Sequence, residues 1–272
     1  MGANGGSNPI QIGGNGAAIV VPVPLVIQAQ GENGKIAIQG DLTGKVLEIY
    51  GPGNTTTFTA GTVTMTEGMP INDSVRIVGE VNLVVGTAAA SANILVTGRL
   101  NGGAGDADKL SLSAQGGDIT IQSSVGDGVN TVSIVSAGLG LVDGLYGDTE
   151  PRVSLSGGSG SGATARVTVA GGVVTDIRLF SPGKGYKVGD RLSLNHGSLK
   201  GVVLEVTSIN DLEGLTVQTA RNVTFGDSVY VDGDVNIFAT GKVVFIGSVV
   251  LHGGGRLFIH DAAQVELSLI HI

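Results

Sequence analysis

The chain contains no cysteine and no tryptophan, and it is poor in aromatic and charged residues. Without cysteine it is not a disulfide scaffold. Charged residues make up 14% of the chain, where about 25% is usual, and the formal net charge is −8. An acidic chain with 4% aromatic residues lacks the basic patches and stacking rings of an ordinary nucleic-acid-binding protein. The 42% content of hydrophobic residues excludes a disordered chain.

Glycine, in contrast, is abundant, with 47 of 272 residues, but it lacks the Gly-X-Y period of collagen. Helix signals are almost absent, while short segments with an apolar residue at every second position recur along the chain. Gly, Asn or Asp separates most of these segments, as expected for tight turns. The pattern predicts an all-β protein with short strands, among them 35–39, 46–50, 109–113, 118–122 and 131–135.

A fixed spacing relates the strands near the C-terminus. A shift of 20 residues places Val223 on Val243 and Phe225 on Phe245, and it also pairs Ser228 with Ser248 and Val229 with Val249. A further shift of 22 residues aligns Leu257, Ile259 and Val265. Three strands in about 20 residues predict one coil of a parallel β-solenoid, in which equivalent residues stack about 4.8 Å apart. A sandwich of antiparallel hairpins is the alternative, but it does not require a fixed shift.

A different pattern interrupts the coils. The segments 165–169 and 173–179 predict a hairpin across Gly171-Gly172, and 191–194 and 202–206 predict two more strands. We therefore expect a small inserted antiparallel β module. The full expected organisation is a Gly/Asn-rich segment 1–19, solenoid 20–156, inserted module 157–209, solenoid coils 210–266 and a tail 267–272.

The tail has two interpretations. Its sequence, LSLIHI, resembles the translated end of a sequencing adapter, which would make the chain a fragment of a longer protein. The alternative is a final buried strand. At the other end, the segment 1–16 contains neither a basic residue nor an apolar run of the kind that marks a signal peptide. The most apolar stretch, 17–27, is too short to span a bilayer, so no membrane span is expected.

The predicted module resembles a recurrent module of large bacterial surface proteins and of phage structural proteins. The resemblance rests on Gly162-Ala163-Thr164-Ala165, the segment 171–175, Pro182-Gly183, Gly185-Tyr186 and Gly189-Asp190. It implies a structural role and no catalytic residue.

The flanking repeats, in 117–128 and 222–237, resemble those of filamentous-haemagglutinin-like proteins and other very large bacterial surface proteins. That family consists of exported parallel β-solenoids displayed as stalks or adhesins. The resemblance implies an extracellular, cell-surface location, further coils of the same chain, and glycans or proteins of neighbouring or host cells as partners.

Calcium is the first candidate ligand. The segment 102–110 resembles the Gly-Gly-x-Gly-x-Asp repeat that binds Ca²⁺ between coils, but Ala107 stands at the Asp position and the motif occurs once. The candidate ligands are Asp106, Asp108, Asp227, Asp232 and Asp234, the last three at predicted corners. The favoured interpretation is that these are turn residues whose carboxylates accept hydrogen bonds from backbone amides.

No residue set indicates catalysis or a bound cofactor. The four histidines have no zinc-binding spacing and are expected at the surface. Asp232 and Asp234 would align with His252 and Gly254, so no ladder of carboxylates forms, and no aromatic platform for sugars is evident. The Gly-rich run 157–162 lacks the Lys-Ser/Thr of a phosphate-binding loop.

We therefore expect a structural or adhesive segment of a large extracellular bacterial protein, acting as a rigid stalk or a binding surface, and not an enzyme. A phage tail-fibre or other virion protein is the first alternative. A polysaccharide-active β-solenoid enzyme is the second.

Overall fold

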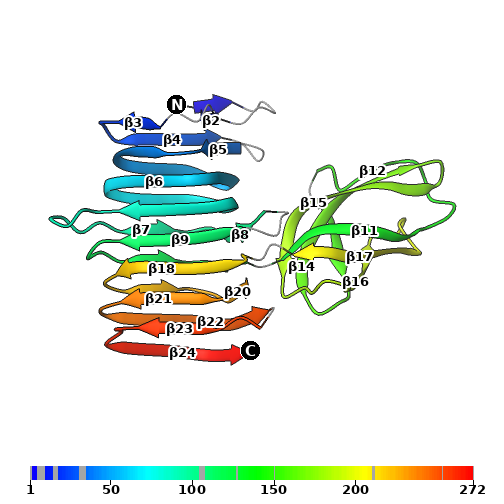
Figure 1. The fold of residues 1–272 in the computed structure, drawn as a ribbon. Coiled ribbons are helices and arrows are strands. Elements are labelled where there is room, and N and C mark those ends of the chain that lie inside the picture. The colour runs from blue at the N-terminus through cyan, green and yellow to red at the C-terminus, as the bar shows by residue number, and fades with distance from the viewer. Residues whose placement is uncertain are drawn as a thin grey trace. The chain divides into compact units, whose positions relative to one another are not determined.

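The computed structural model describes residues 2–4, 10–14, 18–30, 35–103, 108–126, 128–149, 151–209, 212–252 and 254–271. Within these ranges the regular secondary structure is β-strand, and no helix there could cross a membrane. The chain divides into two compact units, Met1–Gly126 with Asp211–Ile272, and Asp127–Asn210. The first is a parallel β-solenoid and the second an antiparallel β module (Figure 1).

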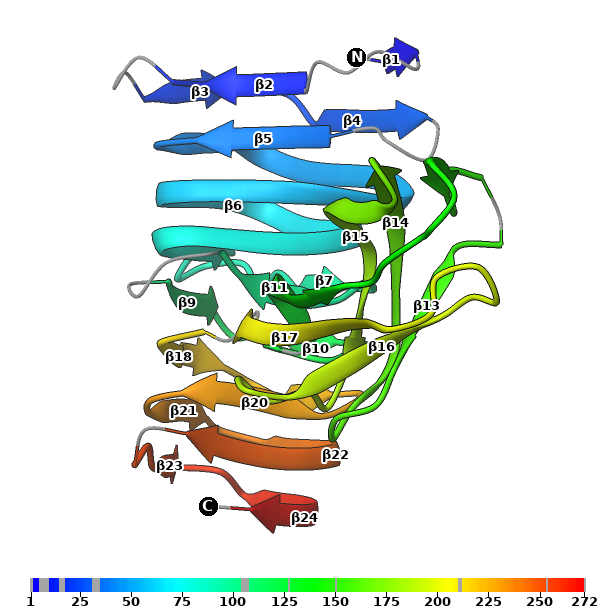
Figure 2. The ribbon, with the colours of Figure 1, turned by 90° about the vertical axis from the view of Figure 1, so that its right-hand side faces the viewer.

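The solenoid is a stack of coils (Figure 2). Equivalent strands of successive coils pair in parallel, and the pairings follow three rows, which we call sheets. Strand β6 is a continuous 44-residue extended segment that contributes to all three sheets. The solenoid strands are β1 (Gly2–Asn4), β2 (Ile10–Gly13), β3 (Ile19–Val21), β4 (Leu25–Gln30), β5 (Lys35–Gln39), β6 (Leu42–Val85), β7 (Ile94–Val96), β8 (Leu100–Gly102), β9 (Lys109–Ala114), β10 (Ile119–Ile121), β18 (Gly214–Ala220), β19 (Val223–Phe225), β20 (Val229–Asp232), β21 (Val235–Ala239), β22 (Lys242–His252), β23 (Leu257–His260) and β24 (Gln264–His271).

The predicted register of the C-terminal coils is confirmed. Val223 pairs with Val243 and Phe225 with Phe245, and the next, slightly longer shift places Val243 on Val265. The rings of Phe225 and Phe245 stack inside the solenoid, with centroids 4.8 Å apart and planes 14° from parallel. Rows of buried aliphatic side chains on either side fill the interior, because inward positions alternate with outward ones along each strand.

Glycine allows the sharp corners where the strands change direction. Gly233, between β20 and β21, has φ +146°, and a Cβ at this position would lie 2.3 Å from the carbonyl oxygen of Glu213 in the preceding coil. Only glycine permits this close approach of two backbones.

The second unit is inserted into the middle of one solenoid strand. Val125 pairs with Val229, and Leu212 pairs with Val231, which lies further along the same neighbouring strand. The coil before the insertion therefore continues after it, and β10 pairs directly with β19 although the whole module separates them in the sequence. In the next coil, only Tyr230 lies between Val229 and Val231. In the interrupted coil, the inserted segment takes the place of that one residue, between Val125 and Leu212.

The module is built from β11 (Val129–Ala137), β12 (Gly144–Tyr146), β13 (Val153–Ser156), β14 (Ser161–Ala170), β15 (Val173–Lys184), β16 (Arg191–Asn195) and β17 (Val202–Ile209). Its pairing order is β11-β17-β16-β13-β14, and both β12 and β15 pair with β14. The predicted hairpin across Gly171-Gly172 is confirmed as β14–β15, with Ala170 paired to Val173. Because Val129 pairs with Ile209, the first and last strands of the module lie side by side.

The residues that carry the resemblance of the module have structural roles. Tyr186 is buried in the core of the module. The carboxylate of Asp190 accepts hydrogen bonds from the amides of Ser159 and Lys187, both 2.9 Å, and from the Ser159 hydroxyl at 2.7 Å. Asp190 thus fastens the turn before β16 to the loop before β14.

The structure places three boundaries differently from the sequence-based expectation. The module begins at Asp127 and not at 157, because β11, β12 and β13 pair antiparallel with module strands, and 131–135 is therefore not a solenoid strand. Within the segment 1–19, β1 and β2 already pair with β4 and β5. At the other end β24 continues into the segment 267–272 and pairs in parallel with β22, and Val265 and Leu267 on it are exposed.

Candidate functional site: an exposed polar and aromatic face of the solenoid

One outward row of the solenoid is polar over four consecutive coils. It lies on the sheet that contains β9, β18, β21 and β23, which we call the third sheet. Asn82 pairs with Ser111, Ser111 with Thr216, and Thr216 with Asn236. The inward neighbours of these residues are buried aliphatics, so the strand alternation holds the amide and hydroxyl groups on the outside. The row offers donors and acceptors at a regular spacing of about 4.8 Å.

A second outward row runs next to the polar row on the same sheet, and a shallow hollow interrupts it. Glu80 pairs with Lys109 and Lys109 with Gly214, which has no side chain to continue the row. The resulting hollow has a volume of about 170 Å³ and is lined by Glu80, Asn82, Lys109, Leu110, Ser111, Gly214, Thr216 and Gln218. This is smaller than the roughly 300–1,000 Å³ of enclosed ligand pockets. The shape suits one group of an extended ligand that lies on the surface.

An aromatic cluster continues the same face on β21, the last strand of the polar row, and on β23 in the next coil. Phe238 pairs with His260, and their rings stack with centroids 4.2 Å apart and planes 9° from parallel. The centroid of the Phe258 ring lies 6.3 Å from that of the His260 ring. In the strand register, Phe258 pairs with Asn236, the last residue of the polar row. Phe238 is 40% exposed and Phe258 36% exposed. Two phenyl rings and an imidazole thus form an apolar platform next to the polar row.

Together the polar row, the hollow and the platform form what we call the binding face. Aromatic rings present a flat apolar surface, and amide and hydroxyl groups can donate and accept hydrogen bonds. That combination matches a ligand with both apolar C–H faces and many hydroxyl groups.

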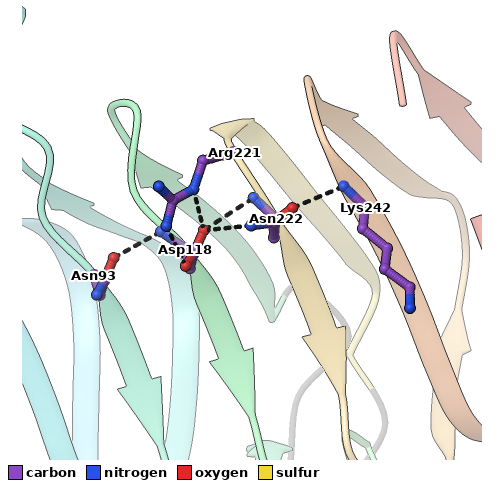
Figure 3. Close-up of polar contacts among 5 residues, drawn as sticks. All are labelled: Asn93, Asp118, Arg221, Asn222 and Lys242. Atoms are coloured by element: carbon purple, nitrogen blue, oxygen red, sulfur yellow. Dashed lines mark hydrogen bonds and ion pairs between the residues drawn. The ribbon is translucent and has the colours of Figure 1, made fainter. Parts of the chain in front are cut away.

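A second polar feature joins the coils on either side of the insertion (Figure 3). The amide of Asp118 donates to Asn93 Oδ1 at 2.8 Å, and the amide of Lys242 donates to Asn222 Oδ1 at 2.8 Å. Between them, Arg221 donates from Nε and Nη2 to the two carboxylate oxygens of Asp118, at 3.0 and 2.7 Å. Each corner side chain therefore accepts from the coil that follows it, which fixes the stacking of four coils. We call this set the corner ladder.

Asp118 is the centre of the corner ladder. Asn222 also donates two hydrogen bonds to Asp118 Oδ1, one from its backbone N–H at 3.2 Å and one from its side-chain Nδ2 at 2.9 Å. The hydrogen bond from Arg221 is the largest cause that lowers the pKa of the Asp118 carboxyl, and the bonds from Asn222 add to it. The carboxylate therefore stays ionised, and the ladder is a structural connection between segments that lie far apart in the sequence.

A buried carboxyl of the solenoid behaves differently. Asp73 is 3% exposed, and its side chain accepts from the hydroxyl of Thr56 at 2.8 Å and from the amide of Ser74 at 2.7 Å. Burial raises the pKa of Asp73 from 3.8 to about 6, against the effect of these two hydrogen bonds. Because both partners belong to the solenoid itself, we assign Asp73 to the core and not to a site.

The four candidate calcium ligands that lie within the described residues do not come together into a metal site. Asp108 accepts from the amides of Gly79 at 2.6 Å and Gly103 at 2.5 Å, while Asp227 and Asp234 accept from the amides of Ser228 and Arg256, both at 2.8 Å. Asp232 pairs at its backbone with His252. Asp106 lies outside the described residues. Within the described ranges no three His, Cys, Asp or Glu side chains are grouped so as to hold a metal ion.

Two expectations about this region are wrong. Asp234 does not align with Gly254, because the shift between these two coils is 22 residues and places Asp234 beside Arg256. The Asp234 carboxylate accepts a hydrogen bond from the backbone amide of Arg256. An aromatic platform does exist, formed by Phe238, Phe258 and His260, and so His260 is stacked on a ring and not simply a solvated surface residue. The signal was available, because the same shift that aligns the start of β21 with the start of β23 also places Phe238 on His260.

No known protein family, curated protein or solved structure matches this chain.

Proposed function

We propose that the chain is a structural and adhesive segment of a large extracellular bacterial surface protein, and that the binding face holds glycans of a neighbouring or host cell. The observation that carries this proposal is the alignment of the polar row, the hollow and the aromatic platform along one sheet of the solenoid. The ligand class that fits is a neutral linear oligosaccharide, which combines apolar ring faces with hydroxyl groups.

The mechanism is mechanical as well as chemical. Stacked coils with continuous backbone hydrogen bonding make a stiff rod, and each further coil adds about 4.8 Å to its length. Sugar rings lie on Phe238 and Phe258, while the hydroxyls exchange hydrogen bonds with Thr216 and Asn236. Because the same sheet supplies all these groups, the binding face is preorganised and loses little entropy on binding.

The test is binding of linear chito- and cello-oligosaccharides to the full chain, measured by isothermal titration calorimetry. Phe238→Ala should weaken binding by about tenfold or more, because it removes one stacking surface. Gly214→Leu should also weaken it, because the added side chain fills the hollow. An added Cβ there meets only ordinary contacts, 3.8 Å from the Asp234 carbonyl oxygen and 3.9 Å from Lys109 Cγ.

Ile246→Ala is the matched control, since Ile246 is exposed on the solenoid but lies outside the binding face. It should bind as the unmodified chain does. The glycan proposal is rejected if none of the oligosaccharides binds, or if Phe238→Ala and Gly214→Leu bind them as tightly as Ile246→Ala does. The proposed location is tested separately, by surface labelling of cells that express the natural gene.

A further inference from the structure

Two arginines lie side by side on the outer face of the module sheet. Arg166 of β14 and Arg178 of β15 are direct partners in the antiparallel register, so their side chains leave the same face of the sheet as neighbours. Ala165 and Val167, on either side of Arg166, are buried in the module core, and the residues on either side of Arg178 pack against that core. Strand alternation therefore holds both arginines on the face away from the core.

A third arginine reaches the same place from the opposite edge of β14. Arg152 comes directly before β13, which pairs with the edge of β14 that β15 does not use. Its guanidinium carbon nevertheless lies 3.7 Å from the centre of the Phe180 ring on β15, and that of Arg178 lies 5.7 Å from the same centre. Arg152 therefore extends across β14, and Phe180 carries one guanidinium on its ring and a second beside it.

The acidic residues nearby balance this charge only in part. Asp148 contacts Arg166 with its Oδ1 3.4 Å from Nη1, and the two side chains are 54% and 26% exposed. The Nε of Arg166 is buried and has no hydrogen-bond partner among the described residues. Asp176, two residues before Arg178, makes no ion pair with it within the described part of the chain. Two like charges thus stand directly opposite each other, an unfavourable arrangement, with one long ion pair between a carboxylate and either of them.

The fold holds these groups in position. The Nη1 of Arg152 donates to the carbonyl oxygen of Gly147 at 3.0 Å and to that of Asp148. Gly147 has φ +70°, and a Cβ there would lie 2.7 Å from the amide nitrogen of Val153. The turn that carries Asp148 is therefore fixed against the start of β13, and a ligand would meet guanidinium groups that are already placed. We call Arg152, Arg166, Arg178 and Phe180 the arginine patch.

A tetrahedral oxyanion fits two adjacent guanidinium groups better than a carboxylate does. Each guanidinium is a planar fork that binds two oxygen atoms at once. A carboxylate has two oxygens, which one fork occupies, whereas a sulfate or phosphate ester offers three oxygens to two forks. The chain as a whole carries a net charge of −8 and repels anions, so the attraction has to come from this local arrangement.

We propose that the arginine patch binds a sulfate or phosphate ester group, held between Arg166 and Arg178 with Arg152 at its rim. The ester oxygens accept hydrogen bonds from both guanidinium groups and remove the repulsion between them. Asp148 stands beside this position as a like charge and limits the affinity. The site lies on the module and uses none of the residues of the binding face.

The test is binding of fluorescein-labelled dextran sulfate to the full chain, followed by fluorescence anisotropy, with unmodified dextran of the same length as the comparison. Dextran sulfate should bind at least about tenfold more tightly than dextran. Arg178→Gln should weaken its binding by about tenfold, because it removes a charged hydrogen-bond donor of the site. Arg191→Gln is the matched control. It removes another exposed arginine, two strands away on β16, and should leave the affinity nearly unchanged.

Two further measurements identify the ligand group. Asp148→Asn should tighten the binding of dextran sulfate, because it removes the like charge beside the oxyanion and frees Arg166 for it. Glucose 6-sulfate and glucose 6-phosphate should compete with dextran sulfate, and the stronger competitor shows which ester the patch prefers. Glucuronate, which carries a carboxylate on the same sugar, should compete less than both.

The proposal is overturned if dextran sulfate binds no better than dextran, or if Arg178→Gln and Arg191→Gln weaken it equally. It is also overturned if Asp148→Asn weakens binding, or if glucuronate competes as well as the two esters. Each variant is checked for an unchanged circular dichroism spectrum. Phe238→Ala, on the binding face, should not alter the binding of dextran sulfate, so this inference and the glycan proposal fail separately.

Discussion

The buried carboxyl of Asp73 should make the stability of the solenoid depend on pH in a direction opposite to that of a salt-bridged carboxylate. Burial raises its pKa in the folded protein from 3.8 to about 6. The folded state thus binds this proton more tightly than the unfolded state does. The stabilisation is complete below about pH 4 and is lost as the pH rises through about 6.

The size of the effect follows from that pKa. A rise from 3.8 to about 6, at about 1.36 kcal/mol for each pKa unit, corresponds to about 3 kcal/mol between acidic and neutral pH. Asp73→Asn removes the titration and keeps an oxygen that accepts from the Ser74 amide and a polar group beside the Thr56 hydroxyl. The variant should therefore be more stable than the unmodified chain at pH 8, by up to about 3 kcal/mol, and similar to it at pH 4.

The assay is urea unfolding followed by circular dichroism at pH 4 and pH 8, with the difference between variant and unmodified chain as the readout. Comparing differences cancels the contribution of every other titrating group. Glu80→Gln, at an exposed position on the same solenoid, controls for the loss of one negative charge. The reasoning fails if the Asp73→Asn difference is the same at both pH values, or if the variant is the less stable protein at pH 8.

Three further predictions concern the coils and the insertion. Phe225→Ala should lower the free energy of unfolding by about 3–5 kcal/mol, because it opens a cavity beside the stacked ring of Phe245; chemical denaturation measures this, and a cost below about 1 kcal/mol would contradict the buried stack. Asp118→Ala should cost about 1–2 kcal/mol at pH 7, because it removes the acceptor of the corner ladder. Since the pKa of Asp118 is lowered in the folded state, that cost should shrink as the pH falls through its folded value, and a pH-independent cost would refute the assignment. Deleting 127–211 and joining Gly126 to Leu212 should leave a folded solenoid, more stable by at most about 4 kcal/mol, the closure entropy of a loop of that length; an unfolded product in circular dichroism would show that the coils depend on the module.

The coil register could be read from the sequence because stacking places like on like. Val223 on Val243 and Phe225 on Phe245 are visible at a fixed shift, and the structure confirms both. The pairing of Ile119 with Val223 could not be found at the 20-residue shift. Most of the residues between them belong to the module, and only those outside it complete the solenoid coil.

The early start of the module could not be read, for a physical reason. Strand β11 alternates apolar and polar residues as a solenoid strand does, since Val132 and Ile134 face a core in either case. What distinguishes the two is the partner strand, β17, which lies at the far end of the module sequence and pairs antiparallel. Local patterning specifies which side of a strand is buried, but not which strand lies beside it.

The corner ladder and the binding face differ in how far the sequence predicts them. Asp118 and Arg221 form a bidentate ion pair although the inserted module separates them in the sequence, so no local motif indicates their contact. The stacking of Phe238 on His260, in contrast, follows from a coil-to-coil shift that the sequence does reveal.

The paired ends of the module also determine how the chain responds to force. While the coils are intact, Val125 and Leu212 are each held in one rung by β20, so tension along the rod bypasses the module. If that rung breaks, the pull reaches β11 and β17 at Val129 and Ile209, where the two strands are antiparallel neighbours. Such a pair is loaded in unzipping geometry, and its hydrogen bonds give way one after another instead of together. Once that rung has broken, the module therefore unfolds at low force and lengthens the chain.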